Sequence, residues 1–365
     1  MPLSRTCFPS IDELAAALKK DDPPMPHPLP GTVFQLPMEK FWDLPPHHSF
    51  EVVEFLPEPR EFVMMQGKKG GCKITAFGDG KRFHYRGQNR RWAPCLATVW
   101  RNDQPSKDRE LNWILSRTRI AEFQILLDQH PMMELARENR IEVDYDALAQ
   151  HYGIPSFWLD VTSSIDVACF FAVAVFNEKG EISPCESGTG IVYRVLWQRF
   201  EEPFRYFTSI SHSPASRPGK QHGWSIGLRE FVDFDSRDFV ERFDFVQSRS
   251  HSERIIDSLS GHLFPVDSIT EVAQTLKTAR AVTMSGIKLA LERDGCPADK
   301  REHVSQIWGE RLCNSLGMDV FLDEEFTLTD AQIQAGHRDA ARARKSFLTD
   351  VCCPIVGTRK DQTAR

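Results

Sequence analysis

The spacing of apolar residues along the chain predicts a mixture of helices and short strands. In residues 109–127 the apolar positions recur with a period close to 3.6, which is typical of one long helix that ends before Pro131. Residues 165–176 are apolar nearly all round, so we expect a helix that is buried on every side. The same patterns favour helices over 10–20, 144–152 and 252–259, and strands over 62–65, 83–85, 190–196 and 239–246. A loop is expected over 217–223. After Thr270 the chain is expected to be mostly helical, with a break over 314–321.

Polar residues and glycine mark the ends of several of these helices. Ser10 followed by Glu13 forms a capping box. One of the three hydroxyl residues at 162–164 is expected to cap the buried helix, with Asp166 in the first turn, where negative charge is favoured. Gly153 suits the left-handed position that follows a helix.

A proline-rich stretch separates the first helix from the rest of the chain. Residues 23–30 contain five prolines, which exclude a helix and favour an extended strap or linker. We therefore expect three parts: 1–59 with the N-terminal helix and strap, 60–275 as the central domain, and 276–365 as a mostly helical extension whose last dozen residues are disordered. The expected fold class is α+β, with a small mixed β-sheet core and flanking helices.

Composition narrows the class of protein. The net charge of −6 argues against indiscriminate binding to nucleic acid or anionic membranes, although a local basic groove is compatible with it. The start of the chain has no apolar stretch of secretory length, and no apolar run reaches the roughly 18 residues of a transmembrane helix. None of the nine cysteines forms a C-x-x-C pair, so neither a disulfide framework nor a zinc site is indicated. These features favour a cytoplasmic protein with free thiols and no membrane partner.

Two short stretches combine apolar runs with polar groups beside glycine or proline. They are residues 83–88 and 151–164. Polar groups at the ends of rigid elements commonly build binding sites, so we expect the two stretches to form one pocket. Arg86 suits phosphate or carboxylate contact, with a structural ion pair to Asp160 as the alternative. His151 is either a cation at a helix end, a proton carrier or a packed capping residue.

Other segments leave similar alternatives open. The hydroxyl residues 162–164 are helix caps that also suit an anion at the helix start. Gln221 and Trp224 can contact a base or nicotinamide ring, or form a surface loop with a docked tryptophan. No P-loop, dinucleotide-binding glycine motif, H-E-x-x-H or G-x-S-x-G pattern occurs.

The motifs of the chain resemble those of the FRG domain family. Tyr85-Arg86-Gly87 resembles the motif that names the family, and residues 151–162 resemble its segment H-Y-G-x-P-T-R-L-L-D-W-T, which an apolar helix follows. Gln221-His222-Gly223-Trp224 resembles a Q-Q-G-aromatic element, and residues 263–267 resemble a closing L-F-P-D segment. The resemblance spans about residues 60–275.

The chain departs from the family pattern at three places. Ser156-Phe157-Trp158 replaces T-R-L, so the arginine of that segment is absent. Val161 stands where tryptophan is usual, and His222 replaces a glutamine. The chain therefore resembles the family as a divergent member would.

A weaker resemblance connects the chain with ADP-ribosyltransferases of the Arg-Ser-Glu type. It implies that NAD binds as a substrate and that no metal takes part. The chain has no Q-x-E or E-x-E motif in the corresponding region, and Glu230 is the nearest downstream carboxylate. The resemblance implies roles for Arg86, Thr162, Ser163 and Gln221. With the residues singled out above, the candidate catalytic residues are Arg86, His151, Asp160 and Gln221, and the candidate NAD-binding residues are Tyr85, Arg86, Gly87, Thr162, Ser163 and Trp224.

Three functions follow as hypotheses. The first is an enzyme that transfers ADP-ribose from NAD, or cleaves NAD, with a protein or nucleic acid as a possible acceptor. The second is a non-catalytic module that binds a nucleotide or peptide. The third is a toxin or phage-defence effector that acts on nucleic acid, which the acidic net charge disfavours. The sequence leaves the oligomeric state open.

Overall fold

The computed structural model describes most of the chain after residue 83. The described residues are 7–22, 62–66, 71–76, 83–101, 103–177, 180–196, 207–210, 214–265, 267–322, 326–346 and 351–352. The proline-rich strap and the C-terminal tail lie outside them.

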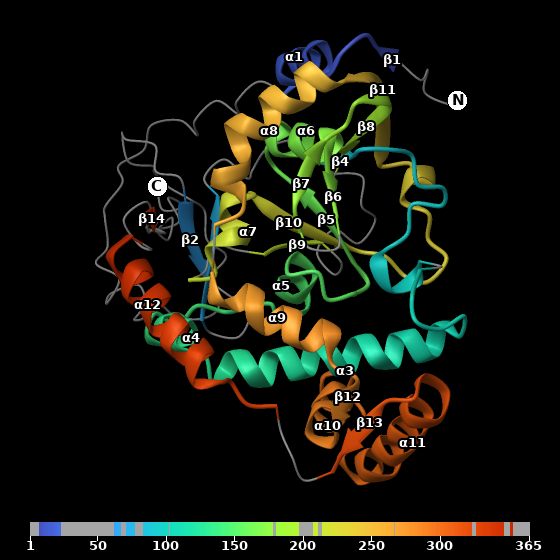
Figure 1. Cartoon of the computed structure of the whole chain (residues 1–365), viewed down its shortest axis with the longest axis vertical. Helices are drawn as coiled ribbons and strands as arrows, with labels where there is room; N and C mark the ends of the chain where they lie inside the picture. The colour runs from blue at the N-terminus through green and yellow to red at the C-terminus, as the bar shows by residue number, and fades with distance from the viewer. Residues whose placement is uncertain are drawn as a thin grey trace, which may run out of the picture.

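A seven-stranded mixed sheet forms the centre of the molecule (Figure 1). Its order is β1 (Cys7–Phe8), β11 (Val240–Ser248), β8 (Ser187–Val195), β4 (His84–Gln88), β5 (Trp158–Thr162), β10 (Gly223–Gly227) and β9 (Phe207–Ser209). Only β1 runs parallel to its neighbour in this sheet, and β11 and β8 pair over their full nine-residue lengths. The prediction of an α+β fold with a mixed sheet is confirmed.

Helix α6 (Ile165–Val173) packs directly on one face of the sheet, chiefly against β4. Asp166 lies in its first turn, as the sequence predicts, and Ser164 is the one of the three candidate residues that caps it. The predicted extension of this helix to residue 176 is wrong, because β6 (Ala174–Phe176) pairs there with β7 (Ile182–Pro184). An apolar run without periodicity does not distinguish a buried helix from a strand.

Two further helices cover α6 from outside. They are α1 (Ile11–Asp21), capped by Ser10, and α8 (Arg249–Leu263). Buried residues of α1, α6, α8 and β4 share one apolar core. Figure 1 shows α1 and α8 at the top of the molecule.

A second helical layer lies at the end of the molecule opposite to α1 (Figure 1). It contains α3 (Arg109–Asp128), α4 (Pro131–Glu138), α5 (Tyr145–His151) and α9 (Ser268–Thr278), which share a separate apolar core. Helix α3 confirms the long helix predicted before Pro131. Gly153, at φ 81°, takes the left-handed position after α5 that the sequence predicts.

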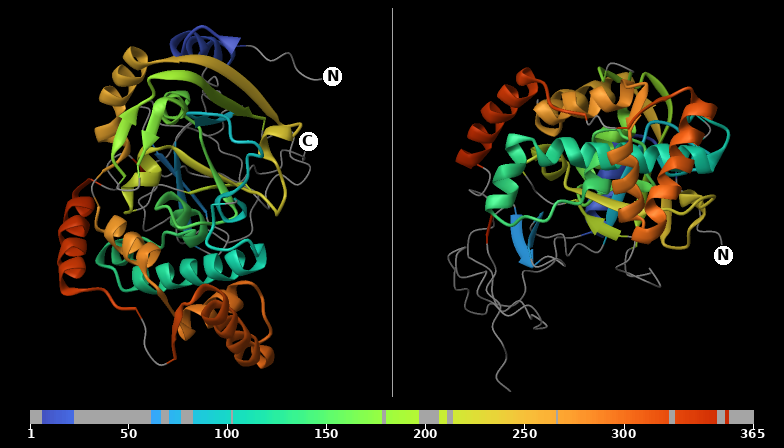
Figure 2. Two further views of the ribbon diagram at one scale, coloured as in Figure 1. Left: turned by 45° about the vertical axis from the view of Figure 1, so that its right-hand side comes forward. Right: turned by 90° about the horizontal axis from the view of Figure 1, so that it is seen from below.

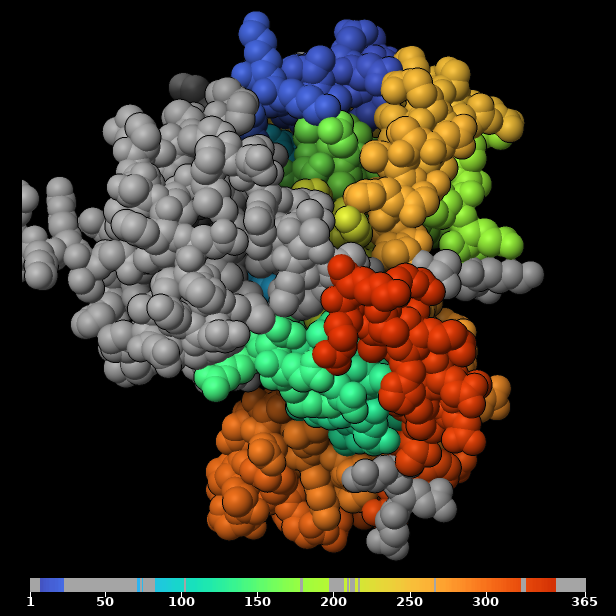
Figure 3. Space-filling view, turned by 90° about the vertical axis from the view of Figure 1, so that its left-hand side faces the viewer, coloured from blue at the N-terminus to red at the C-terminus, as the bar shows by residue number. Residues whose placement is uncertain are grey.

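The C-terminal part packs against α3 and α4. Strand β12 (Ala281–Thr283) pairs in parallel with β13 (Asp319–Phe321), and α10 (Met284–Arg293) and α11 (Ala298–Leu316) lie between them in sequence. Figure 2 shows this pair of helices on the far side of α3. Helix α12 (Asp330–Ser346) lies on the surface against α4 and α9 (Figure 3).

The remaining elements are small. Strand β2 (Phe62–Gln66) pairs with β3 (Cys72–Ala76) and with β14 (Val351–Cys352), and short helical turns form η1 (Thr98–Trp100) and η3 (Phe234–Ser236). The loop predicted over 217–223 is wrong, since α7 (Ser216–Lys220) occupies most of it and Gly223 begins β10.

Candidate functional site

The two sequence motifs meet on neighbouring strands. β4 carries Tyr85-Arg86-Gly87 and pairs with β8 over five residues, but it pairs with β5 only at Tyr85 and Thr162. Beyond this single pair the ladder does not continue, which leaves space between residues 86–88 of β4 and residues 160–161 of β5. The tertiary structure therefore places the motifs on two sides of one opening.

A cavity of about 850 Å³ occupies this region. This size falls within the range typical of small-molecule sites. Seven of the candidate residues line it, namely Tyr85, Arg86, Gly87, His151, Asp160, Thr162 and Gln221. Ser163 and Trp224 do not line it.

Arg86 crosses the opening but does not pair with the carboxylate of Asp160. Its Nη1 donates a hydrogen bond of 2.6 Å to the backbone carbonyl of Asp160. Its Nε is buried without a hydrogen-bond partner. The ion pair considered for these two residues is therefore replaced by a contact to a backbone carbonyl.

His151 lies in a chain of hydrogen bonds that assigns its tautomer. Gln221 Nε2 donates to the carbonyl of Leu263 at 3.0 Å, so the Oε1 atom faces His151 Nδ1 at 3.2 Å. Because Oε1 is an acceptor, Nδ1 carries the proton. Burial lowers the pKa of the imidazole, which Asp160 opposes, so the ring is neutral rather than a cation at the end of α5.

The second ring nitrogen of His151, Nε2, also lies beside an acceptor. His151 Nε2 lies 3.4 Å from Asp160 Oδ1, and both atoms are buried without a hydrogen-bond partner. Asp160 Oδ2 accepts a hydrogen bond of 3.3 Å from Gln150 Nε2. A third of the Asp160 side chain is exposed (33 %), and with Oδ1 sealed this surface includes the Oδ2 side. Both His151 and Asp160 line the cavity, and Asp160 is the more exposed of the two.

The hydroxyl residues after β5 act mainly in the local structure. Thr162 Oγ1 donates to the Gln221 carbonyl at 2.8 Å and accepts from the Ser164 backbone at 3.0 Å. Ser163 is buried, with its backbone N–H bonded to the His222 carbonyl. These contacts connect β5 to the turn before β10.

Trp224 belongs to an aromatic group on the opposite face of the sheet. It alternates with Gly223 and Ser225, which oppose Thr162 and Asp160 across the ladder. Its ring stacks on Phe207 at 4.7 Å and meets His84 edge-on at 4.7 Å. The predicted stacking of Trp224 on a bound ring therefore has no support from its position.

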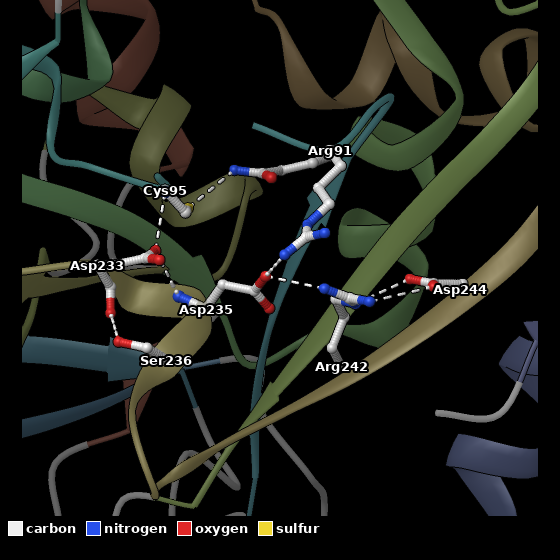
Figure 4. Close-up of polar contacts among 8 residues, drawn as sticks. Arg91, Cys95, Asp233, Asp235, Ser236, Arg242 and Asp244 are labelled. Carbon is white, nitrogen blue, oxygen red and sulfur yellow. Dashed lines mark hydrogen bonds and ion pairs between the residues drawn. The ribbon is translucent and has the colours of Figure 1, made fainter. Parts of the chain in front are cut away.

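A polar network holds the segment that follows β4 (Figure 4). Gln88 Nε2 donates to Cys95 Sγ at 3.3 Å, and the Cys95 backbone N–H donates to Asp233 Oδ1 at 2.8 Å. Asp235 accepts from Arg91 at 3.1 Å and from Arg242 at 2.8 Å. Burial raises the pKa of the Cys95 thiol, which indicates a structural role for this cysteine.

Several cavity residues were not selected from the sequence. Arg101, Gln150, Arg217 and Lys277 line it, and so does Glu271. Thr270, Glu271, Gln274 and Lys277 form the polar face of α9, whose other face is buried. A polar helix face is visible in the sequence, but its position against a cavity is not.

Glu230 lies elsewhere. Its carboxylate is 3.7 Å from Arg109, and it does not line the cavity. The carboxylates that do line it are Asp160 and Glu271, so these are the acidic groups available to a ligand there.

Neither a metal site nor a membrane span emerges from the described residues. Within them, no three histidine, cysteine, aspartate or glutamate side chains come together as metal ligands. Among the same residues, no helix has both the length and the apolar character needed to cross a bilayer.

Comparison with known families agrees with the first resemblance. Residues 81–181 match the FRG domain family, and this segment contains both principal motifs. The elements at 221–224 and 263–267 lie beyond the match. No curated protein and no solved structure matches the chain, so the resemblance to ADP-ribosyltransferases stays a prediction. Residues 81–181 of the chain are therefore similar to the FRG domain family.

Proposed function

We propose that the chain binds a nucleotide-like anion, with NAD as the leading candidate, and transfers or releases its ADP-ribosyl group. The observation that carries the proposal is the charge of the cavity. Four cationic side chains, Arg86, Arg101, Arg217 and Lys277, line it together with two carboxylates, Asp160 and Glu271. This local excess of positive charge occurs in a chain whose net charge is −6, and it favours an anionic ligand.

The other walls suit the uncharged parts of such a ligand. Tyr152, Phe171, Phe176 and Phe264 line the cavity and offer aromatic surface to a base or nicotinamide ring. Arg86 belongs to the first motif and contacts the second through the Asp160 carbonyl, so it is the first residue to test.

In the proposed reaction the bond between ribose and nicotinamide breaks, and its electron pair leaves with nicotinamide. The acceptor oxygen or nitrogen bonds to the ribose carbon and gives up a proton. Asp160 is the carboxylate of the second motif and lines the cavity. It is therefore the candidate to stabilise positive charge on the ribose or to accept that proton. Gln150, which donates to Asp160 Oδ2, acts as a positioning residue, and His151 packs beside Oδ1.

Nicotinamide release and mass spectrometry of ADP-ribosylated products test this function. Wild-type protein is expected to bind NAD in calorimetry and to consume it, and Arg86→Gln is expected to lower turnover at least tenfold. Arg109→Gln is the matched control, because Arg109 does not line the cavity. Absence of NAD binding, or equal turnover in both variants, would reject the proposal.

The second candidate is a binding module without catalysis. It is favoured by the sealed contact between His151 and Asp160 and by the occupied amide of Gln221, since side chains engaged in this way stabilise a fold. NAD or another nucleotide that binds without being consumed would support this alternative. A role as a toxin or defence effector would add growth arrest on expression, lost in Arg86→Gln.

A further inference from the structure

Two cationic side chains from different helices line the same cavity. Arg217 belongs to α7 and Lys277 to the last turn of α9. The Arg217 guanidinium lies 4.8 Å from the ring centre of Phe264 and 5.5 Å from that of Tyr152. These aromatic contacts hold its position without neutralising its charge.

Neither cation has a carboxylate partner among the described residues. Arg217 makes no ion pair there, and its Nε is buried without a hydrogen-bond partner. Asp267 interacts with Arg217 through space. Its Oδ2, however, accepts from the Tyr152 hydroxyl, and its Oδ1 accepts from the backbone and hydroxyl of Thr270. The charge on Arg217 is therefore available to a ligand.

The two cations also repel one another. Desolvation and the nearby Arg217 charge lower the pKa of the Lys277 ammonium. At Arg101, burial and the charge of Arg86 lower the pKa of the guanidinium, and Asp103 and Asp160 oppose this. The two cationic pairs thus have different surroundings: Asp103 and Asp160 act on Arg101, whereas Asp267 acts on Arg217 while it accepts three other hydrogen bonds.

We propose that Arg217 and Lys277 form the phosphate subsite of this cavity, which binds the phosphate or diphosphate of the nucleotide. The identity of the ligand as a nucleotide rests on the proposed function, whereas the recognition of phosphate does not. Arginine offers a planar set of donors to phosphate oxygens, and lysine adds a compact charge. Arg86 and Asp160 then contact the sugar portion of the ligand.

Calorimetry with ADP and adenosine tests the assignment, because these ligands differ only in their phosphates. Arg217→Gln and Lys277→Gln are each expected to weaken ADP binding at least tenfold and to leave adenosine binding unchanged. Arg86→Gln is expected to weaken both ligands alike. Lys288→Gln is the control, because Lys288 lies on α10 in an ion pair with Glu302. Since Arg217 packs against two rings, thermal unfolding verifies that its variant is folded, and Lys277→Gln provides an exposed second position.

Binding of inorganic pyrophosphate tests the phosphate subsite independently of the proposed function, because this ligand contains no nucleoside. Wild-type protein is expected to bind pyrophosphate, and Arg217→Gln and Lys277→Gln are each expected to weaken this binding at least tenfold. Pyrophosphate binding without nucleotide binding would reject the proposed function alone. No pyrophosphate binding, or binding and ADP preference unaffected by both variants, would overturn the subsite.

Discussion

The two ring nitrogens of His151 differ because their neighbours differ. Nδ1 faces the fixed carbonyl oxygen of Gln221, whereas Nε2 faces the Asp160 carboxylate at 3.4 Å without a donor between them. A histidine at the end of a helix usually gains from being charged. Here burial outweighs that gain and lowers the pKa of the ring.

We expect His151 to be neutral at pH 7, with its proton on Nδ1. The folded ring keeps this state below the ordinary pKa near 6.5, because burial disfavours the imidazolium. Nitrogen NMR of histidine-labelled protein reports both the charge and the tautomer. Gln221→Met removes the acceptor of the Nδ1 proton and is expected to cost about 1–3 kcal/mol of stability. An imidazolium, or a proton on Nε2, in wild-type protein at pH 7 would contradict the assigned network.

His130 shows burial of a histidine at a helix start. Its Nδ1 accepts from the Met132 backbone as the N-cap of α4, and α12 covers the ring near Gly336. Burial lowers its pKa to about 4, while Asp339 raises it and His337 lowers it further.

This shift makes stability depend on pH. Above pH 6.5 the ring is neutral in both states, but between pH 6.5 and 4 the unfolded chain binds a proton that the folded chain does not. Stability is therefore expected to fall by up to about 3 kcal/mol across this range. His130→Asn keeps a capping side chain that does not titrate, so urea unfolding at pH 7 and pH 4 should show a smaller loss. Equal losses in the variant and wild type would refute this account.

At the scale of elements, the contact between β4 and α6 requires a glycine. A Cβ built on Gly87 would lie 1.8 Å from the Ala168 carbonyl oxygen and 2.7 Å from the Ala172 nitrogen. Both atoms belong to the helix backbone, so no side-chain rotation can relieve the clash. The glycine of the Tyr-Arg-Gly motif therefore sets how closely the helix approaches the strand that carries Arg86.

We expect Gly87→Ala to destabilise the protein by about 3 kcal/mol or more, since α6 would have to move. Gly261→Ala is the matched control within α8, where a Cβ meets no atom within 4 Å. That control should gain about 0.5–1 kcal/mol, because alanine favours a helix over glycine. Thermal unfolding of both variants compares the two effects, and similar stability for both would contradict the close approach.

At the scale of the whole molecule, the N-terminal segment is part of the central core. β1 adds to the edge of the main sheet, and Ile11, Leu14 and Leu18 of α1 are buried with residues of α6. The Tyr85 hydroxyl donates to Asp22 at 2.8 Å, which connects the end of α1 to β4. Contacts from residues 7–22 thus support the strand that carries the motif.

Leu14→Ala should therefore destabilise the entire domain. The side chain has 0 % exposure, and its truncation is expected to cost about 2–5 kcal/mol. Lys20→Ala on the exposed face of the same helix should change stability by less than about 0.5 kcal/mol. Urea unfolding followed by tryptophan fluorescence measures both, because the tryptophans lie outside α1. A small effect of Leu14→Ala would show that α1 is not integral to the core.

Much of this arrangement follows from local signals in the sequence. Periodicity located α3 and α5, Ser10 and Ser164 marked helix starts, and Gly153 marked a helix end, because capping and propensity act within one or two turns. The motif residues Arg86 and Asp160 were also found from local pattern, Arg86 after an apolar run and Asp160 between two apolar residues.

Long-range packing settled what those signals left open. The sequence could not show that Arg86 bonds to a carbonyl instead of a carboxylate, that Trp224 lies on the opposite face from Asp160, or that Lys277 of a distant helix lines the same cavity as Arg217. Each depends on the register of strands and the docking of helices, which join residues far apart in the chain. Solvent exclusion then determines the charge states, as at His151, because burial exists only once the elements have packed together.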